Sequence, residues 1–179
     1  IIPTLNLFKV MQRLSKKFHV IFASSGGSVY APVSHGRSMR EDDTLLSDTS
    51  YGVQKIAIEN YLRIAVKSGF MKATVLRISN PYGVLLPASR KQGFIGVALQ
   101  RIIQNEPVLL FGNPDNVRDY IHLDDLTNAF VSALNREGNP FEVYNIGTGT
   151  GYSVNDIISI IERLTARIIN TESINQKGA

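Results

Sequence analysis

The amino-acid sequence predicts an α/β fold in which a parallel sheet is covered by helices on both faces. Short apolar segments rich in β-branched residues alternate with longer segments that have helical periodicity. The strand candidates are continuously apolar, which is typical of strands buried on both faces. Polar or glycine-rich loops follow three of these strands, at 24–28, 79–83 and 147–151. Because ligands bind off the carboxyl ends of parallel strands, we expect the functional site at that edge of the sheet.

The first half of the chain is expected to begin with a helix that carries proline in its first turn. A short apolar strand, an irregular polar segment, a long helix and a β-branched strand follow it. These predicted elements are, in order, Pro3–Lys17, His19–Ala23, Ala31–Thr49, Ser50–Lys67 and Ala73–Ile78. A turn with asparagine, proline and glycine comes next, at 79–83.

The second half is expected to contain three helices, one with an acidic cap and the last one amphipathic, interspersed with short strands. The predicted elements are a helix at Gly93–Gln104, strands at Val108–Phe111 and Arg118–His122, a helix capped by Asp124 or Asp125 that runs to Asn135, a strand at Phe141–Ile146, and a helix capped by Ser153 with Asp156 in its first turn. The tail from Arg167 is polar and weakly patterned.

Composition excludes several classes of function. The chain has 179 residues, of which 44% are hydrophobic and 19% charged, as in ordinary soluble domains. The absence of cysteine rules out disulfides, thiolate zinc sites and cysteine nucleophiles. No apolar run could span a bilayer, and no signal peptide is recognisable. The net charge of +4 is scattered and forms no stripe that would follow a nucleic acid, so a small anionic ligand fits better.

Tyr51 and Lys55 lie four residues apart in the long predicted helix, so they share one face of it. A free phenol loses its proton near pH ~10, and an ammonium beside it stabilises the phenolate. The pair is therefore a candidate general acid/base. The same spacing also occurs on ordinary helix faces, so other parts of the chain have to support this interpretation.

Four motifs supply that support, because they occur in order along the chain: Ser24-Ser-Gly-Gly-Ser-Val-Tyr30, Tyr51-Gly-Val-Gln-Lys55, Arg77-Ile-Ser-Asn-Pro-Tyr-Gly83 and Arg118-Asp-Tyr-Ile-His-Leu-Asp-Asp125. Together they resemble the NAD-dependent epimerase/dehydratase family of extended short-chain dehydrogenases/reductases, and within it the UDP-glucose 4-epimerase-like nucleotide-sugar epimerases. The resemblance covers about residues 3–164.

The resemblance implies the C-terminal part of a Rossmann-like doubly wound parallel sheet together with a small α/β substrate-binding region. Residues 1–83 would form the rear part of the dinucleotide-binding domain. Residues 84–179 would be mainly the substrate-binding region, with segments near 119–146 returning to the sheet. The family also implies a cytoplasmic homodimer that binds a nucleotide sugar, a UDP-hexose, and that has no nucleic-acid or membrane partner.

The resemblance also implies a mechanism. Tyr51 would be the catalytic base, and Lys55 would hold the nicotinamide ribose of NAD while stabilising the phenolate. Tyr51 would take the proton of the sugar 4-hydroxyl during transient oxidation at C4, and the keto-sugar would then be reduced on its other face. This is the chemistry of a UDP-hexose 4-epimerase, in which the cofactor stays bound.

The serine loop departs from the family pattern. The family carries a serine or threonine three residues before the valine of the Val-Tyr pair, and that position is Gly26 here. Ser25 or Ser28 would have to supply the hydroxyl that contacts the reacting group, and Ser28 is slightly favoured. Ser24 is assigned to the cofactor side. The alternative is that these serines only satisfy backbone groups in a tight loop.

Further motif residues match binding positions of the family. Asn80 and Pro81 match positions that meet the nicotinamide and the substrate phosphates, and Arg118 matches an arginine aimed at the UDP diphosphate, a task suited to a bidentate donor. A plain turn and a solvated strand-end charge are the alternatives. His122 and the two aspartates after it suggest a metal cluster at first sight, but such aspartates are more often helix caps, so no metal is expected.

The dinucleotide fingerprint is missing from the chain. The loop Gly147–Gly151 imitates a phosphate loop without matching its spacing, and we expect it to line the substrate side. A family member would carry its glycine-rich turn before Ile1. The chain therefore looks like the carboxyl-terminal part of an epimerase, and we expect it to retain NAD poorly and to be inactive in isolation.

Other functions remain open. The 4,6-dehydratases of the family carry an Asp-Glu pair where this sequence has Gly27 and Ser28, which argues against that reaction. Epimerisation at another carbon, reduction of a keto-sugar, and NADP in place of NAD are not excluded. A non-catalytic nucleotide-binding relative is the alternative of another class. Gly26 and the missing fingerprint favour it, whereas the presence of Tyr51 and Lys55 argues against it.

Overall fold

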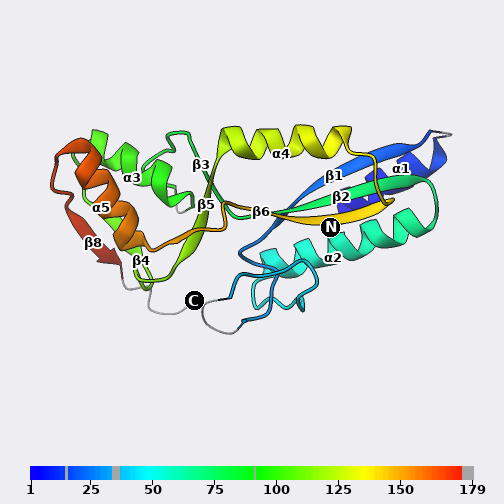
Figure 1. Ribbon diagram of the computed structural model, residues 1–179, viewed down its shortest axis with the longest axis horizontal. Coiled ribbons are helices and arrows are strands. Elements are labelled where there is room, and N and C mark those ends of the chain that lie inside the picture. The colour runs from blue at the N-terminus through cyan, green and yellow to red at the C-terminus, as the bar shows by residue number, and fades with distance from the viewer. Residues whose placement is uncertain (15, 34–36, 91, 175–179) are drawn as a thin grey trace. The chain divides into compact units, whose positions relative to one another are not determined.

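The computed structural model describes residues 1–14, 16–33, 37–90 and 92–174. The chain divides into two compact units, which are described separately (Figure 1). Unit 1 consists of Ile1–Ser79 and Asp125–Ile146, and unit 2 consists of Asn80–Asp124 and the chain from Gly147 onward. The assignment of cofactor and substrate binding to separate parts of the chain stays a prediction.

Unit 1 is built on a three-stranded parallel sheet, as the apolar strand candidates predict. Its strands are β1 (Phe18–Ser25), β2 (Met71–Ile78) and β6 (Phe141–Ile146), in the order β1-β2-β6. The central strand β2 is buried along most of its length, because it has a neighbour on each side and helices on its faces. The expected α/β class with a parallel sheet is confirmed.

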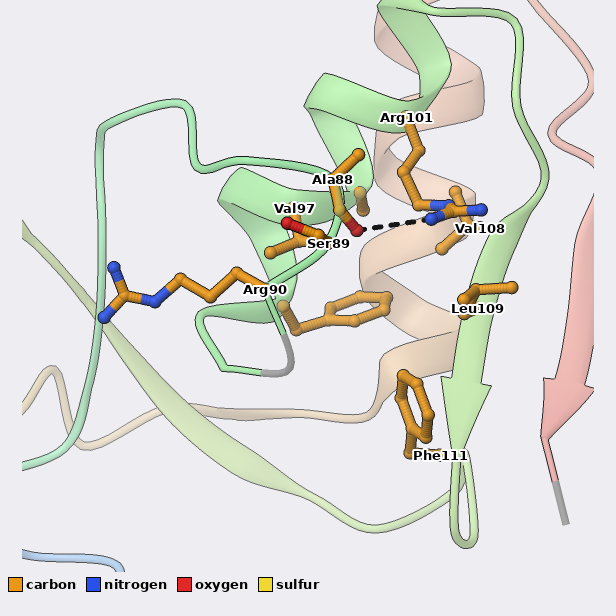
Figure 2. A pocket seen from close by; sticks show the side chains of 10 residues that line it. Ala88, Ser89, Arg90, Val97, Arg101, Val108, Leu109 and Phe111 are labelled. Carbon is orange, nitrogen blue, oxygen red and sulfur yellow. Dashed lines mark hydrogen bonds between the residues drawn. The ribbon is translucent and has the colours of Figure 1, made fainter. Parts of the chain in front are cut away.

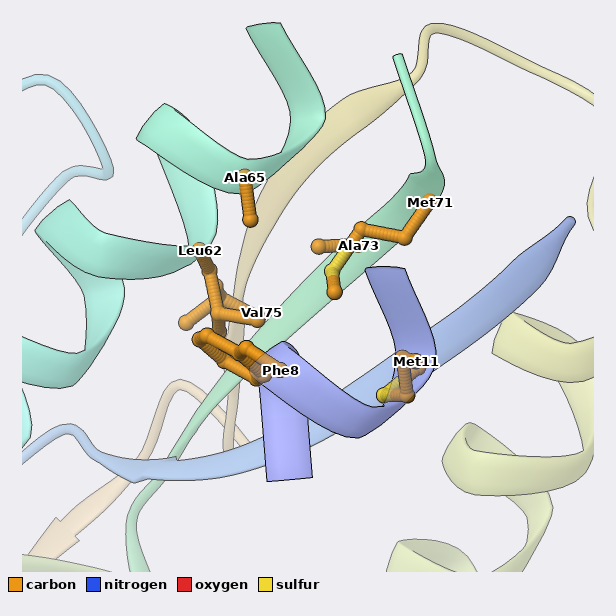
Figure 3. Packing of buried hydrophobic residues seen from close by; sticks show 7 residues of the cluster. All are labelled: Phe8, Met11, Leu62, Ala65, Met71, Ala73 and Val75. Atoms are coloured by element: carbon orange, nitrogen blue, oxygen red, sulfur yellow. The ribbon is translucent and has the colours of Figure 1, made fainter. Parts of the chain in front are cut away.

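Two helices cover one face of this sheet, α1 (Ile2–Arg13) and α2 (Ser50–Lys67). Alternate residues of β2 point to this face and pack against buried residues of both helices, as Figure 3 shows. The cluster consists of Phe8, Met11, Leu62, Ala65, Met71, Ala73 and Val75. The bounds of α2 agree with the prediction. Helix α1 ends at Arg13, four residues before the predicted Lys17, because Leu14 adopts an extended conformation.

Helix α4 (Leu123–Asn135) lies on the side of the sheet opposite α2 (Figure 1). The prediction that Asp124 or Asp125 caps it is wrong, since the helix begins at Leu123 and both aspartates lie in its first turn. His122 has the capping role instead: its Nδ1 accepts a hydrogen bond from the Asp124 backbone N–H at 3.2 Å. Acidic side chains in a first turn interact favourably with the helix dipole, so their position is still physically reasonable.

Unit 2 contains short strands and two helices, α3 (Phe94–Ile103) and α5 (Val154–Thr165). Strand β5 (Arg118–His122) pairs in parallel with β3 (Asn80–Tyr82) and antiparallel with β7 (Gly151–Tyr152). Strand β4 (Val108–Phe111) pairs in parallel with β8 (Thr171–Ile174). The core of the unit lies between the two helices and β4, and includes Ala98, Val108, Leu110, Ile157, Ile161 and Ile169.

The capping box predicted for α5 is confirmed, with the Ser153 and Asp156 side chains each bonded to the other residue's backbone. Strands β3, β7 and β8 were not predicted. They have two to four residues each, and their pairing partners are distant in sequence, so local patterns carry little information about them. In the part of the chain that the structure describes, no helix is long and apolar enough to cross a membrane.

Candidate active site

The structure brings Tyr51 and Lys55 together at the start of α2. Thr49 caps this helix by accepting a hydrogen bond from the Gly52 backbone N–H at 3.1 Å. The Lys55 Nζ lies 5.3 Å from the centroid of the Tyr51 ring and donates a hydrogen bond of 2.7 Å to the Ala23 carbonyl oxygen on β1. The Tyr51 side chain is 54% exposed, so a ligand can reach its phenol without a change in the fold.

The environment of Lys55 is partly apolar. Burial lowers the pKa of its ammonium below the ordinary value, and the charge of Glu59, one helical turn further on, acts in the opposite direction. The Phe22 ring lies 4.9 Å from the Nζ atom. Because an ammonium has three N–H donors and Ala23 is its one hydrogen-bond acceptor among the described residues, donors remain for the hydroxyls of a ribose. This donor set fits the role that the resemblance implies toward NAD.

The loop after β1 is held close to β2. The Gly26 backbone N–H donates to the Ile78 carbonyl oxygen at 2.7 Å. A Cβ at Gly26 would lie 3.2 Å from the Arg77 carbonyl oxygen and 3.3 Å from that of Ile78, which is tighter than ordinary contact. The close backbone approach explains how a glycine suits this position, where the family pattern has a hydroxyl residue.

The three candidate serines have different environments. Ser24 is buried, and its hydroxyl donates to Glu59 at 2.5 Å; its assignment to the cofactor side stays a prediction. Ser25 and Ser28 are half-buried. Within the described residues, no hydrogen-bond partner of either hydroxyl was found, so both are free to contact a ligand. The choice between them stays open.

Gly52 lies where the first turn of α2 packs closely against the serine loop. It is buried in the first turn of α2, and a Cβ there would lie 2.1 Å from the Ser28 carbonyl oxygen and 2.1 Å from the Ser47 hydroxyl oxygen. Only a glycine allows the backbone next to Tyr51 to approach Ser28 this closely. A glycine directly after Tyr51 was the available indication of this close packing, but no local pattern showed which residues it would contact.

A buried charged pair next to this site was missed by the sequence interpretation. The guanidinium of Arg77 on β2 binds the carboxylate of Glu59 on α2, with an Nη2–Oε2 distance of 2.8 Å, and the side chains are 2% and 4% exposed. The same guanidinium donates to the Tyr30 hydroxyl at 2.8 Å and to the Glu41 carbonyl oxygen at 3.0 Å. The available signal was an arginine within a predicted buried strand, where a charge requires a partner.

The remaining predicted binding residues lie in unit 2. The Asn80 side-chain amide donates to the Asp119 carbonyl oxygen at 3.0 Å, which ties β3 to β5. Pro81 is exposed at the middle of β3. Arg118 is exposed at the start of β5, where its guanidinium donates to the Val117 carbonyl oxygen at 3.1 Å. The exposed guanidinium of Arg118 is thus accessible to an anion.

The glycine loop at 147–151 is organised around the carboxylate of Asp119. The backbone N–H of Thr148 donates to Asp119 at 3.0 Å and that of Gly149 at 2.7 Å, and the Thr148 hydroxyl adds a third bond. A carboxylate of the chain itself therefore occupies the backbone donors that a phosphate loop would offer. This contact supports the prediction that the loop is no dinucleotide fingerprint.

Unit 2 also contains a cavity of about 180 Å³ between α3 and β4 (Figure 2). Its walls are largely apolar and include two phenylalanines, Phe94 and Phe111. Arg101 fixes one wall by donating to the Ala88 carbonyl oxygen at 3.2 Å and to the Pro107 carbonyl oxygen at 2.6 Å. Aromatic side chains in a cavity wall can pack against a flat ring.

The described residues contain no group of three or more acidic or histidine side chains arranged to hold a metal ion. His122, which the sequence placed near two aspartates, packs its ring edge-to-face against Tyr82, with centroids 5.2 Å apart. The Tyr82 contact and the capping bond to Asp124 account for its position.

Comparison with known proteins identifies the relatives of this chain. The family model described as "NAD dependent epimerase/dehydratase family" matches residues 1–147. A dTDP-4-dehydro-6-deoxyglucose reductase of Escherichia coli is 41% identical over 143 residues, which cover 80% of this chain and 44% of the reductase. A UDP-glucose 4-epimerase of Bacillus subtilis is 30% identical over 186 residues, covering 92% of this chain and 52% of the epimerase.

Solved structures give the same result at the level of the fold. The UDP-glucose 4-epimerase of Thermotoga maritima, solved with UDP-glucose, superposes with a TM-score of 0.85 at 30% identity. The match covers 99% of this chain and 57% of that one. The chain thus spans about half the length of the relatives it matches.

Proposed function

Since the chain belongs to the NAD-dependent epimerase/dehydratase family, we propose that it carries the acid/base centre of an enzyme acting at C4 of a nucleotide-linked hexose, specifically a UDP-hexose 4-epimerase. The observation that carries the proposal is the pairing of an accessible Tyr51 phenol with the Lys55 ammonium, held by the strand β1. Relatives named UDP-glucose 4-epimerase support the choice of reaction.

The proposed chemistry follows from the two side chains. The Tyr51 phenolate takes the proton of the sugar 4-hydroxyl and later returns it, and the positive charge of Lys55 stabilises the phenolate between these steps. NAD⁺, when bound, would supply the acceptor for the hydride that C4 loses while its hydroxyl gives its proton to Tyr51. The hydrogen bond to Ala23 restrains the Lys55 side chain, so its charge stays at one position on the face that Tyr51 occupies.

Residues of unit 2 are assigned to the nucleotide part of the substrate. The exposed Arg118 guanidinium has the geometry to bind a diphosphate with two parallel bonds. The cavity between α3 and β4 has largely apolar walls with two phenylalanines, which suit a planar base. Asn80 has one side-chain group committed to Asp119, which leaves its carbonyl oxygen for a ligand.

A keto-sugar reductase is the second candidate. The observation that favours it is the 41% identity to a dTDP-4-dehydro-6-deoxyglucose reductase, which exceeds the identity to the named epimerases. The same side chains serve both reactions, because Tyr51 would donate a proton to the carbonyl oxygen as a hydride arrives at C4. The two reactions differ in redox balance: epimerisation returns the cofactor unchanged, whereas reduction consumes NADH or NADPH.

A substrate comparison tests the proposal. The full-length protein that contains this sequence is incubated with UDP-glucose and with UDP-N-acetylglucosamine, and the 4-epimers are measured by NMR. In parallel it receives dTDP-4-dehydro-6-deoxyglucose with NADH or NADPH, and consumption of the reduced cofactor is followed. We expect 4-epimer formation without added reductant. Cofactor consumption without epimer would establish the reductase, and binding without either reaction would indicate a non-catalytic relative.

Serine substitutions decide which hydroxyl serves the site. We expect Ser28→Ala to lower kcat by about 10- to 100-fold, the value of a hydrogen bond to a charged group, and Ser25→Ala to lower it by less. Each variant is the control for the other, because both hydroxyls lie in the same loop. Steady-state kinetics of the full-length protein at fixed pH is the measurement. A larger loss in Ser25→Ala would reverse the assignment, and unchanged kcat in both would mean that the serines only shape the loop.

A further inference from the structure

Three polar residues form a row across the sheet of unit 1. Ser24, Arg77 and Asn145 are register neighbours on β1, β2 and β6, and each is the penultimate residue of its strand. We call these three residues the polar row. They lie directly before the loops at the carboxyl edge of the sheet, where the functional site of such a sheet is expected.

The polar row is joined by one buried network. Glu59 accepts hydrogen bonds from the Ser24 hydroxyl and from the Arg77 guanidinium. The guanidinium also donates to the Tyr30 hydroxyl at 2.8 Å, and this hydroxyl donates to the Asn145 side-chain oxygen at 2.5 Å. Ser24, Glu59 and Arg77 are each less than 5% exposed, so they are not available to a substrate.

Stability alone does not explain why this sheet contains a buried network of charged and polar groups. Removing an arginine and a glutamate from water is costly, and an apolar pair of similar volume is often as stable or more stable. The ion pair fixes the relative orientation of its partners, because the planar guanidinium donates hydrogen bonds only along its fixed N–H directions.

The network holds both ends of the serine loop. Ser24 precedes the loop and is tied to Arg77 through Glu59, whereas Tyr30 follows the loop and is tied to Arg77 directly. Ser25 and Ser28 lie between these two anchors. Residues 39–41 are attached to the same row, since Arg77 donates to the Glu41 carbonyl oxygen and Asn145 donates to that of Met39.

The network also fixes α2 against β1. Two bonds connect these elements one helical turn apart: the Lys55 ammonium donates to Ala23, and the neighbouring Ser24 donates to Glu59. Tyr51, Lys55 and Glu59 are spaced by four residues along one face of the helix. The position of Glu59 thus determines how the face with Tyr51 and Lys55 meets the strand.

We infer that Glu59 and Arg77 are positioning residues that hold the Tyr51–Lys55 face and the serine loop in register with each other at the carboxyl edge of the sheet. This inference rests on the proposed function, which it deepens by naming residues that act through the acid/base pair without contacting the substrate. It also assigns Ser24 to this network in place of a contact with the cofactor.

The Lys55 ammonium is the direct reporter of this arrangement. The charged and titratable side chains around it are Tyr51 and Glu59 on its own helix, with Arg77 of β2 paired to Glu59, while β1 contributes the Ala23 carbonyl and the Phe22 ring. The Glu59 carboxylate attracts the ammonium and so raises the pKa of Lys55. Removing that charge makes loss of the proton easier, and the pKa of Lys55 should fall.

The test compares Glu59→Gln with Leu62→Ala in the 179-residue chain. Leu62 is fully buried in the core of the same helix and takes no part in the network, so its truncation destabilises the unit without changing a charge. The side-chain NMR signal of Lys55 is followed as a function of pH, and amide exchange of residues 25–29 is measured. We expect only Glu59→Gln to lower the pKa of Lys55 and to accelerate exchange in the loop.

A second variant keeps the test decisive if Glu59→Gln fails to fold. Tyr30→Phe retains the ring and removes only the hydroxyl that bridges Arg77 and Asn145. It should accelerate exchange at 25–29 while the titration of Lys55 stays unchanged. The positioning role would be disproved if Glu59→Gln matched Leu62→Ala in both measurements, or if Tyr30→Phe left the loop as protected as it is in the wild type.

Kinetics of the full-length protein supply the catalytic readout. In Glu59→Gln we expect kcat to fall by about 10- to 100-fold, as for a small misplacement of reacting groups, with KM nearly unchanged and partial recovery in Glu59→Asp. A kcat loss no greater than that of Leu62→Ala would contradict the inference. Failure of the proposed function would give a different result. The wild-type protein would then show no turnover, while Glu59→Gln would still lower the pKa of Lys55 and accelerate amide exchange at 25–29.

Discussion

Replacing Tyr51 by phenylalanine is expected to lower kcat of the full-length protein by about 10²- to 10⁴-fold, the usual contribution of a general acid/base. The loss follows because phenylalanine has the same ring but no proton to exchange with the sugar oxygen. The fold should be unaffected, since the Tyr51 side chain is 54% exposed. Turnover measured with the accepted nucleotide sugar, together with thermal unfolding of the variant, checks both parts of this expectation.

Tyr61→Phe is the matched control for that experiment. Tyr61 lies on the same helix and is 42% exposed, but it is more than two turns beyond Tyr51. It should retain wild-type kcat and stability. Full turnover by Tyr51→Phe would refute the mechanism, whereas equal losses in both variants would trace the effect to the helix surface.

Replacing Gly52 by alanine is expected to destabilise unit 1 by about 1–3 kcal/mol, which is the usual effect of overpacking. The added Cβ would lie 2.1 Å from both the Ser28 carbonyl oxygen and the Ser47 hydroxyl oxygen. The first turn of α2 and the serine loop would have to separate. Because this separation moves Tyr51 relative to the loop, we also expect a kcat loss beyond the change in folded fraction. Chemical denaturation and steady-state kinetics measure the two effects.

Gly27→Ala provides the comparison within the same loop. A Cβ at Gly27 would meet no atom within 4 Å, so alanine is accommodated without a shift. Its free energy of unfolding should stay within about 0.5 kcal/mol of the wild-type value, as for most unconstrained surface changes. If Gly52→Ala were as stable and active as Gly27→Ala, the close approach of helix and loop would have no role in the site.

Much of the sheet and its edge could be predicted because the controlling signals are local. A run rich in β-branched residues identified β2, and the predicted helix at 50–67 agrees with α2. The spacing of Tyr51 and Lys55 placed them on one face of this helix. The family could be inferred because four short motifs occurred in order, and the match over residues 1–147 confirms it.

The cap of α4 shows where local reasoning fails. Two aspartates before an apolar helix favour a capping role, but the helix already begins at Leu123, and His122 accepts the bond from the Asp124 backbone N–H. The signals for a cap and for an acidic first turn are the same residue types shifted by one or two positions. Strand β8 was missed for a different reason, since its stability comes from pairing with β4 about sixty residues earlier.

The sequence by itself determined the α/β class, the acid/base candidates and the family, because each depends on residue type and spacing along a single element or motif. Only the tertiary structure shows the contacts of Ser24, Gly52 and the Glu59–Arg77 pair. Their partners come from other elements of the chain. Ser24 and Glu59 are 35 residues apart, and Glu59 and Arg77 are 18 residues apart. A buried hydrogen bond or a backbone contact exists only once the chain has brought both groups together, so no spacing along the sequence encodes it.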